Sequence, residues 1–179
     1  MPLIANAFGY QVVWLVAVIG AGQGRPVWGI SAAGVFVVAQ WVTSKYRAAD
    51  AFLIVLSLAL GVCLDGLLSL GGWLSYASPA PALVAPAWIL AIWAAFAMTF
   101  NHSLRFLQGR PAWALALGAM GGPLAYWSAA RGFDAVQWMA SPVQIVAVLA
   151  LTWAAVVAVL AEAARIWRVS IHASAKEWR

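Results

Sequence analysis

Six long apolar stretches divide the chain, and charges, prolines and glycines separate them. Each stretch has close to the ~20 residues that a helix needs to cross ~30 Å of hydrocarbon. None shows the alternating polarity of a membrane strand. The pattern predicts an all-α, polytopic integral membrane protein, built as a bundle of six transmembrane helices. The spans are expected near residues 3–20, 27–43, 51–72, 85–104, 111–130 and 142–164.

The composition excludes an ordinary soluble domain. Of the 179 residues, 65% are hydrophobic and 8% are charged, against about 25% charged in soluble domains. So few charges cannot cover a water-facing surface, and lipid must cover it instead. The end of the chain is different: residues 165–179, "RIWRVSIHASAKEWR", are expected to form a basic amphipathic cytoplasmic tail that lies against anionic lipid.

The basic residues test the threading independently, because six spans place successive connections on alternate sides of the membrane. Eight of the ten Lys and Arg residues fall on one side, namely Lys45, Arg47, Arg105, Arg110, Arg165, Arg168, Lys176 and Arg179. Only Arg25 and Arg131 fall on the other side. By the positive-inside rule, both termini are expected in the cytoplasm.

The fourth apolar segment ends in "TFNHSLRF", residues 99–106, where several polar side chains interrupt the apolar run. As one continuous helix, this segment would gather its bulky residues on a lipid-facing stripe: Ile89, Trp93, Phe96, Phe100, Leu104 and Leu107. Asn101, His102 and Arg105 would then face inward among alanines. His102 and Asn101 are therefore candidate catalytic residues, and Arg105 is a candidate ligand for a lipid phosphate.

Other polar residues lie within the first two segments. Asn6 is expected low in the membrane, Gln40 at a depth similar to that of His102, and Gln11 near the middle of the membrane. All three are candidate ligand-binding groups, and an inner polar network could form from Asn6, Gln40, Asn101 and His102. Glu162 with Arg105 or Arg165 could close that network at the interface. The alternative is a set of hydrogen bonds that only hold helices together, each worth ~0.6–2 kcal/mol.

Asp65 is the one acidic residue well inside an apolar segment. The others lie at or beyond segment ends: Asp50, Asp134, Glu162 and Glu177. Asp65 is a candidate catalytic residue, and Tyr126 lies near its depth and could donate a hydrogen bond to it. Because Asp65 and His102 differ in depth by roughly 12 Å, two separate sites are predicted. The outer site is either functional or a structural bond between helices.

The fifth segment contains "GAMGGPLAY", in which Pro123 frees a backbone carbonyl and favours a kink or polar opening. "GGWLSY" at 71–76 echoes "GGPLAY" at 121–126, but the two fall at different depths, so we do not interpret them as a repeat. The chain lacks a glycine-rich phosphate loop, zinc-ligand spacing and a serine-nucleophile motif. We therefore expect no metal, no cofactor and no nucleic-acid partner.

Several motifs together resemble a known family. They are "NAFGYQVVWLVAVIGAGQG" at the start, "CLDGLL" around Asp65, "PAWILAIWAAFAMTFNHSLRFL" in the fourth segment and "GAMGGPLAYWSAARG" in the fifth. The chain resembles, over nearly its whole length, small bacterial inner-membrane proteins that share a domain of unknown function (twenty-eight seventy-eight). The resemblance implies about six spans. It also implies membrane lipid as a substrate or neighbour, because the family is associated with gene groups that modify fatty-acyl chains.

Three functional hypotheses follow. The first is envelope-lipid or fatty-acyl modification, as an intramembrane enzyme or an accessory subunit, with Asn101, His102 and Arg105 at the working site. The second is a small transporter or permease that uses Asp65, Tyr126 and the Pro123 kink. The third is a structural or assembly role, with a membrane-protein partner or as a homo-oligomer, in which the polar residues only hold helices together. Whether the protein is an enzyme stays open at this point.

Overall fold

A computed structural model describes residues 3–78 and 85–177, with side chains described as far as Trp167. The elements, in chain order, are α1 (Leu3–Gly22), α2 (Val27–Thr43), α3 (Arg47–Leu70), β1 (Leu74–Tyr76), α4 (Ala87–Ala97), the 3₁₀ helix η1 (Arg105–Leu107), α5 (Pro111–Arg131), β2 (Val136–Trp138) and α6 (Pro142–Glu177).

The chain is an all-helical membrane protein, as its sequence predicts. Within the described residues, three helices are long and apolar enough to cross a membrane: α1, α3 and α6 as far as Trp167. Helices α2 and α4 are apolar but shorter. The count of six spans and the cytoplasmic placement of both termini remain predictions.

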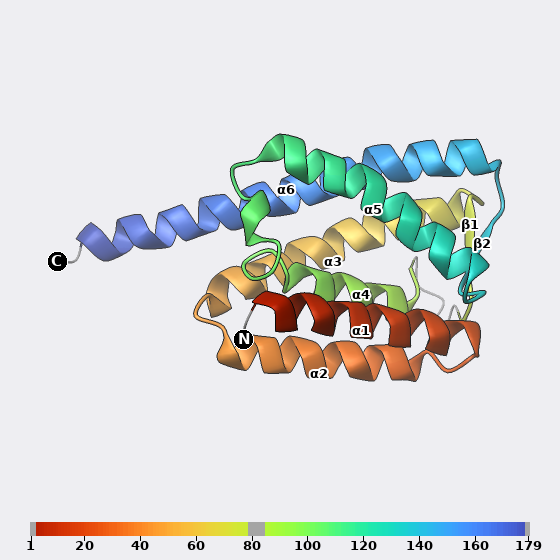
Figure 1. Cartoon of the computed structure of the whole chain (residues 1–179), viewed down its shortest axis with the longest axis horizontal. Coiled ribbons are helices and arrows are strands. Elements are labelled where there is room, and N and C mark those ends of the chain that lie inside the picture. The colour runs from red at the N-terminus through yellow and green to blue at the C-terminus, as the bar shows by residue number, and fades with distance from the viewer. Residues whose placement is uncertain (1–2, 79–84, 178–179) are drawn as a thin grey trace.

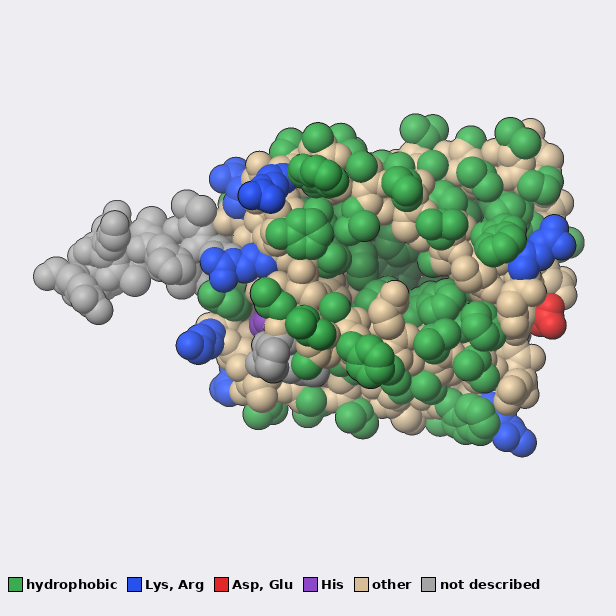
Figure 2. Space-filling model, in the orientation of Figure 1, with side chains coloured by type: hydrophobic (Ala, Val, Ile, Leu, Met, Phe, Trp, Pro, Cys, Tyr) green, Lys and Arg blue, Asp and Glu red, His purple; other side chains and the backbone are tan. Residues whose placement is uncertain are grey.

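The helices lie lengthwise beside one another in a bundle (Figure 1). Helices α1, α2, α3 and α4 pack together, while α5 packs along α6 and α6 packs on α3. Lys and Arg side chains gather at one end of the molecule, which we call the basic end (Figure 2). The α2–α3 corner, η1 and the start of α5 lie at this end (Figure 1) and carry the exposed Lys45, Arg47, Arg105 and Arg110. The exposed Arg165 of α6 lies beside Gly109, just before α5. The start of α1 lies at this end, and α6 continues beyond it (Figure 1). We call the opposite end, where β1 and β2 lie, the strand end.

Two short strands at the strand end were not predicted. β1 and β2 pair antiparallel, with Leu74 opposite Trp138 and Tyr76 opposite Val136. They tie the connection after α3 to the connection after α5. Each strand has three residues, which is too short for an alternating pattern to stand out in the sequence.

Helix α4 departs from the prediction of a helix through 85–104. It ends at Ala97, after which tight bonds such as Thr99 N–H to Phe96 O (2.9 Å) lead into a turn formed by residues 98–104. We call this segment the 98–104 turn. The predicted lipid-facing stripe is also wrong, because Trp93 is 2% exposed and Phe100 is 0% exposed. Helices α1, α2 and α3 surround α4, so its large side chains fill the core.

Two other helix ends differ from the expected bounds. α3 begins at Arg47, about one turn earlier than predicted, which brings Asp50 into its first turn. α6 continues without a break to Glu177, so the expected tail is helical and continuous with α6 over 165–177. The tail's predicted amphipathic character rests on side chains after Trp167 and on residues 178–179, which lie outside the described part of the chain.

Candidate functional site

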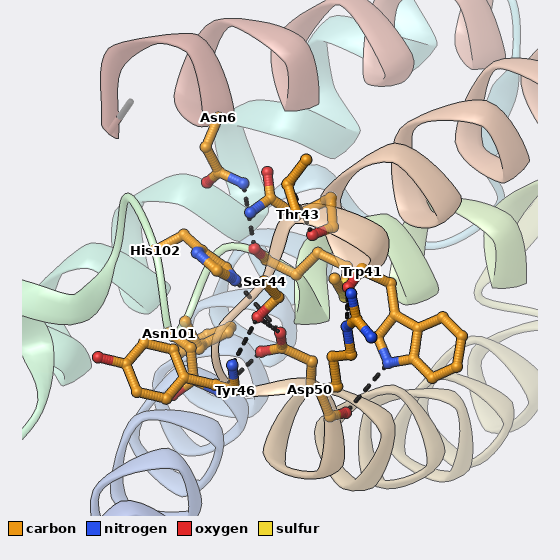
Figure 3. A network of polar contacts seen from close by, with 12 residues as sticks. Asn6, Trp41, Thr43, Ser44, Tyr46, Asp50, Asn101 and His102 are labelled. Atoms are coloured by element: carbon orange, nitrogen blue, oxygen red, sulfur yellow. Dashed lines mark hydrogen bonds and ion pairs between the residues drawn. The ribbon is translucent and has the colours of Figure 1, made fainter. Parts of the chain in front are cut away.

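A buried carboxylate, Asp50, is the centre of a polar site near the basic end (Figure 3). Asn101 donates a hydrogen bond from Nδ2 to Asp50 Oδ1 at 2.8 Å. His102 Nε2 lies 3.3 Å from Asp50 Oδ2, and the Ser44 hydroxyl also donates to Oδ2. Asp50 is 0% exposed. Two predicted site residues therefore converge on an acid that the sequence analysis had placed outside the apolar core.

The corner between α2 and α3 positions this carboxylate. Ser44 follows the last turn of α2 with an extended backbone, and its hydroxyl accepts a hydrogen bond from Tyr46 N–H at 2.9 Å. Asp50 N–H in turn donates to Tyr46 O at 2.8 Å, within the first turn of α3. The positive end of the α3 dipole favours a negative side chain in that turn. The sequence analysis missed the role of Asp50 because it placed the start of this helix after Asp50, at residue 51, instead of at Arg47.

Asn6 fixes the other side of the 98–104 turn. Its Nδ2 donates to Met98 O at 3.1 Å, while its Oδ1 accepts from Ser103 N at 3.2 Å and from Ser103 Oγ at 2.6 Å. The predicted inner network is thus real in part: α1 holds the turn on one side, and α3 holds it on the other (Figure 3).

Other candidates from the sequence fall outside these contacts. Gln40 is 0% exposed, and within the described residues both of its amide atoms lack a hydrogen-bond partner. Arg105 is exposed near the basic end. Arg165 Nε donates to Glu162 Oε2 at 2.8 Å on the surface of α6, so this predicted pair forms apart from the Asp50 site.

Asp65 forms a second site toward the strand end. Its Oδ1 accepts hydrogen bonds from the Tyr76 hydroxyl at 2.7 Å and from the Tyr126 hydroxyl, and its Oδ2 accepts from Trp93 Nε1 at 2.6 Å. Asp65 is 0% exposed. The predicted contact with Tyr126 is confirmed. This carboxylate joins α3, α4, α5 and β1, and the three donors use both of its oxygens.

Tyr76 was missed as a partner, although the sequence carried a signal for it. The two similar segments, 71–76 and 121–126, each end in the tyrosine that donates to Asp65 Oδ1. Tyr76 lies in β1, beyond the helices, and burial near Tyr126 and Asp65 raises the pKa of its phenol. The phenol therefore remains protonated and able to donate.

The two carboxylates are far apart, and the predicted separation of Asp65 from His102 follows from this. Asp50 and Asp65 lie on the same helix, and the helical rise separates them by about 22 Å. His102 contacts the first, while Trp93 and Tyr126 contact the second. A direct Asp65–His102 pair does not form. Among the described residues, no three His, Cys, Asp or Glu side chains group as metal ligands.

A groove of about 480 Å³ lies between α1 and α5. Figure 2 shows it as a hollow with hydrophobic walls. Phe96 of α4 and Trp153 of α6 also line it, and the 98–104 turn contributes Thr99 and Ser103. The predicted candidate Gln11 lies in its wall. A smaller cavity of about 50 Å³ adjoins it, sharing Tyr10, Trp14, Phe96, Ala125 and Trp153 and reaching Trp88.

The fold and these sites define a class: a helical membrane protein with an apolar groove and, apart from it, a buried aspartate in contact with a partly buried histidine. Residues 3–159 match the family described as "Protein of unknown function (DUF2878)", and the chain belongs to that family. This confirms the family resemblance in the sequence. No curated protein and no solved structure matches the chain. The function is therefore argued from the geometry of the two sites and the groove.

Proposed function

We propose that this protein is a multi-pass protein of the bacterial inner membrane that binds one acyl chain of an envelope lipid, as an intramembrane enzyme or an accessory subunit to one. The groove carries the proposal. Its volume of about 480 Å³ falls within the range of ligand-binding pockets. Two of the helices that line it, α1 and α6, are long and apolar enough to cross a membrane, and its lining is predominantly apolar. An apolar chain is the ligand that such walls favour.

The length of the groove suits a single chain. With its adjoining cavity, it is lined along α5 from Leu117 to Ala129. Twelve residues of helical rise correspond to ~18 Å. One leaflet contributes about half of the ~30 Å hydrocarbon thickness. A chain from one leaflet therefore fits the groove along the helix axes.

The basic end supplies a place for an anionic headgroup. Arg47 donates to the carbonyls of Trp41 and Val42, and Arg165 pairs with Glu162, so these two arginines are already engaged. Among the described side chains at the basic end, three other cations are exposed: Lys45, Arg105 and Arg110. Guanidinium and ammonium groups at the headgroup level attract phosphate, and the positive-inside rule assigns this end to the cytoplasm.

The geometry supports this proposal better than the transporter hypothesis. That hypothesis requires water to reach Asp65, but the Asp65 carboxylate is buried and accepts three hydrogen bonds. A fully bonded carboxylate that joins four elements is well suited to holding the bundle together.

A glycine in the groove wall offers a direct test. A Cβ at Gly121 would meet nothing within 4 Å, so Gly121→Leu extends into the groove without a clash at that atom. Gly34 on α2 is the matched control, because it is exposed, has the same open space and lies outside the groove lining. The test is retention of phosphatidylglycerol by purified protein in mild detergent, measured by native mass spectrometry.

The expected result is weaker lipid binding by Gly121→Leu alone. Displacing two methylene groups of the ligand removes ~1.6 kcal/mol of apolar burial, which is more than a tenfold loss of affinity. Wild type and Gly34→Leu should bind equally. Equal binding by a folded Gly121→Leu variant would show that the acyl chain does not occupy the groove.

A further inference from the structure

We propose that the groove selects an acyl chain that carries a hydroxyl group part-way along its length, and that the Gln11 side chain on α1 forms a hydrogen bond with that hydroxyl. The substrate class is a hydroxylated fatty-acyl chain of a membrane lipid. This inference rests on the proposed function, because it concerns a chain bound in the same groove. It assigns Gln11 as a specificity-determining residue of that groove.

The serine and threonine hydroxyls in the groove wall already have partners within the protein. The Thr99 and Ser128 hydroxyls each donate to a backbone carbonyl of the preceding turn at 2.6 Å. The Ser103 hydroxyl donates to Asn6 Oδ1, also at 2.6 Å. The donor protons of all three groups are therefore used inside the protein, and none of them needs a ligand.

Gln11 differs from these residues. Its side chain is exposed and lines the groove, and within the described part of the chain neither its amide nitrogen nor its amide oxygen forms a hydrogen bond. A primary amide offers two donors and one acceptor oxygen. Leaving such a group unpaired in an apolar environment costs free energy. The position therefore favours a ligand that supplies a polar partner.

The depth of Gln11 makes water a poor partner. Helix α1 is long and apolar enough to cross a membrane. Gln11 is eight residues from Leu3 and eleven from Gly22, so the helical rise places it ~12 Å from one end of α1 and ~16 Å from the other. On a span of ~30 Å of hydrocarbon, this position is near the middle. The bilayer core offers no water there to pair with the amide.

Gln11 also lies between the two ends of the groove. On α1, the groove and its adjoining cavity are lined from Ala7 to Val18. The helical rise places Gln11 ~6 Å from Ala7 and ~10 Å from Val18. A group of the ligand that meets Gln11 therefore belongs to the interior of the acyl chain, away from both its ester and its terminal methyl group.

Two aromatic residues of α1 add polar atoms to the same part of the wall. Tyr10 and Trp14 line both the groove and the cavity. Within the described residues, neither the Tyr10 hydroxyl nor the Trp14 indole N–H forms a hydrogen bond. Trp14 is three residues after Gln11, so the two side chains are neighbours on one helix face. The wall at this level thus presents several donors and acceptors to a bound chain.

A hydroxyl suits this set of groups better than other chain modifications. It can use both the donor and the acceptor of the Gln11 amide, whereas a ketone uses the donor alone and a double bond uses neither. Apolar walls discriminate weakly between chains, but a polar group that stays unpaired with the wrong ligand discriminates strongly. Gln11 therefore favours the hydroxylated chain over its plain counterpart.

Competition between two lipids tests the inference in the wild-type protein. Purified protein in mild detergent is mixed with equal amounts of two phosphatidylglycerols that differ in one hydroxyl near the middle of one acyl chain. Native mass spectrometry distinguishes the two complexes by mass. A neutral hydrogen bond predicts a ~3- to 10-fold preference for the hydroxylated lipid. Lipids with the hydroxyl beside the ester or at the end of the chain should show a smaller preference, which tests the position of Gln11 without a substitution.

Gln11→Met removes the amide and keeps a side chain of similar length that favours a helix. The preference should then fall toward equal binding of the two lipids. Ser128→Ala is the matched control, because Ser128 lines the same groove but its hydroxyl already donates to Leu124 O. This control should keep the wild-type preference.

Equal binding of the two lipids by wild type would overturn the inference, and so would a preference that persists in Gln11→Met. Gly121→Leu distinguishes these outcomes from failure of the proposed function, since it should weaken binding of both lipids. If wild type binds the two lipids equally and Gly121→Leu binds both weakly, the chain occupies the groove and only the hydroxyl preference fails. If Gly121→Leu binds both lipids as wild type does, the proposed function itself fails.

Discussion

Gly118 lies where the backbones of α5 and α6 approach closely, and it supports a stability prediction. A Cβ built at this position would lie 2.7 Å from Trp153 C and 2.8 Å from Ala154 Cα, and closer still to Trp153 O. All three are backbone atoms, so rotation of a side chain cannot relieve the overlap. Gly118→Ala therefore forces the two helices apart.

The size of the effect can be worked from this geometry. Overpacking of a tight interface costs ~1–3 kcal/mol, while replacing a helical glycine with alanine returns up to ~1 kcal/mol. We expect Gly118→Ala to destabilise the protein by about 1–2 kcal/mol. Gly121→Ala is the matched control, since it lies one turn further along α5 and its Cβ meets nothing within 4 Å. That variant should gain up to ~1 kcal/mol.

The measurement is unfolding of wild type and both variants in the same detergent, by heat or by added dodecyl sulfate. The loss of helical circular dichroism gives the difference in stability between them. Wild type should fall between the two variants. A Gly118→Ala protein as stable as Gly121→Ala would refute the close backbone approach of α5 to α6. The rings of Trp153 and Trp93 stack with their centroids 4.8 Å apart. If α5 and α6 move apart, this stacking should weaken, and tryptophan fluorescence should change.

Two further predictions concern buried polar groups. Gln40→Met should stabilise the protein by about 1–3 kcal/mol, because it removes buried amide atoms that have no hydrogen-bond partner among the described residues. A lower melting temperature for this variant would mean that the Gln40 amide does have a hydrogen-bond partner. Tyr126→Phe removes one donor from Asp65 and should cost ~0.6–2 kcal/mol in the same assay. Tyr10→Phe is its control, since no hydrogen bond of Tyr10 is present within the described residues. Equal losses of stability in the two variants would contradict the role of the hydrogen bond to Asp65.

Much of the fold was predictable because a bilayer imposes one period and one length on every helix. The predicted range 27–43 coincides with α2, and 111–130 differs from α5 by one residue. The Asp65–Tyr126 contact was also predictable, since helical rise converts residue number into depth. Asp65 and Tyr126 were predicted at similar depths, and an apolar segment offers few other polar side chains at that depth with which either could form a hydrogen bond.

Helix α4 shows where the sequence pattern fails. The pattern assigned its bulky stripe to lipid, yet Trp93 and Phe96 are buried in the protein core. Lipid tails are as apolar as leucine side chains, so hydrophobicity cannot distinguish a lipid-facing residue from a core residue. The early end of the helix at Ala97 was hidden for the same reason, because the apolar run continues beyond it.

The sequence by itself determined the class of the protein, most of its helices, the contact of Asp65 with Tyr126 and its membership of a family. Only the tertiary structure decided that His102 and Asn101 meet Asp50, since this depends on where α3 begins and α4 ends. It also decided the groove, which lies between α1 and α5, helices that are far apart in the chain. Depth is a one-dimensional property that the sequence encodes directly, whereas lateral packing between helices in an apolar solvent leaves little trace in hydrophobicity.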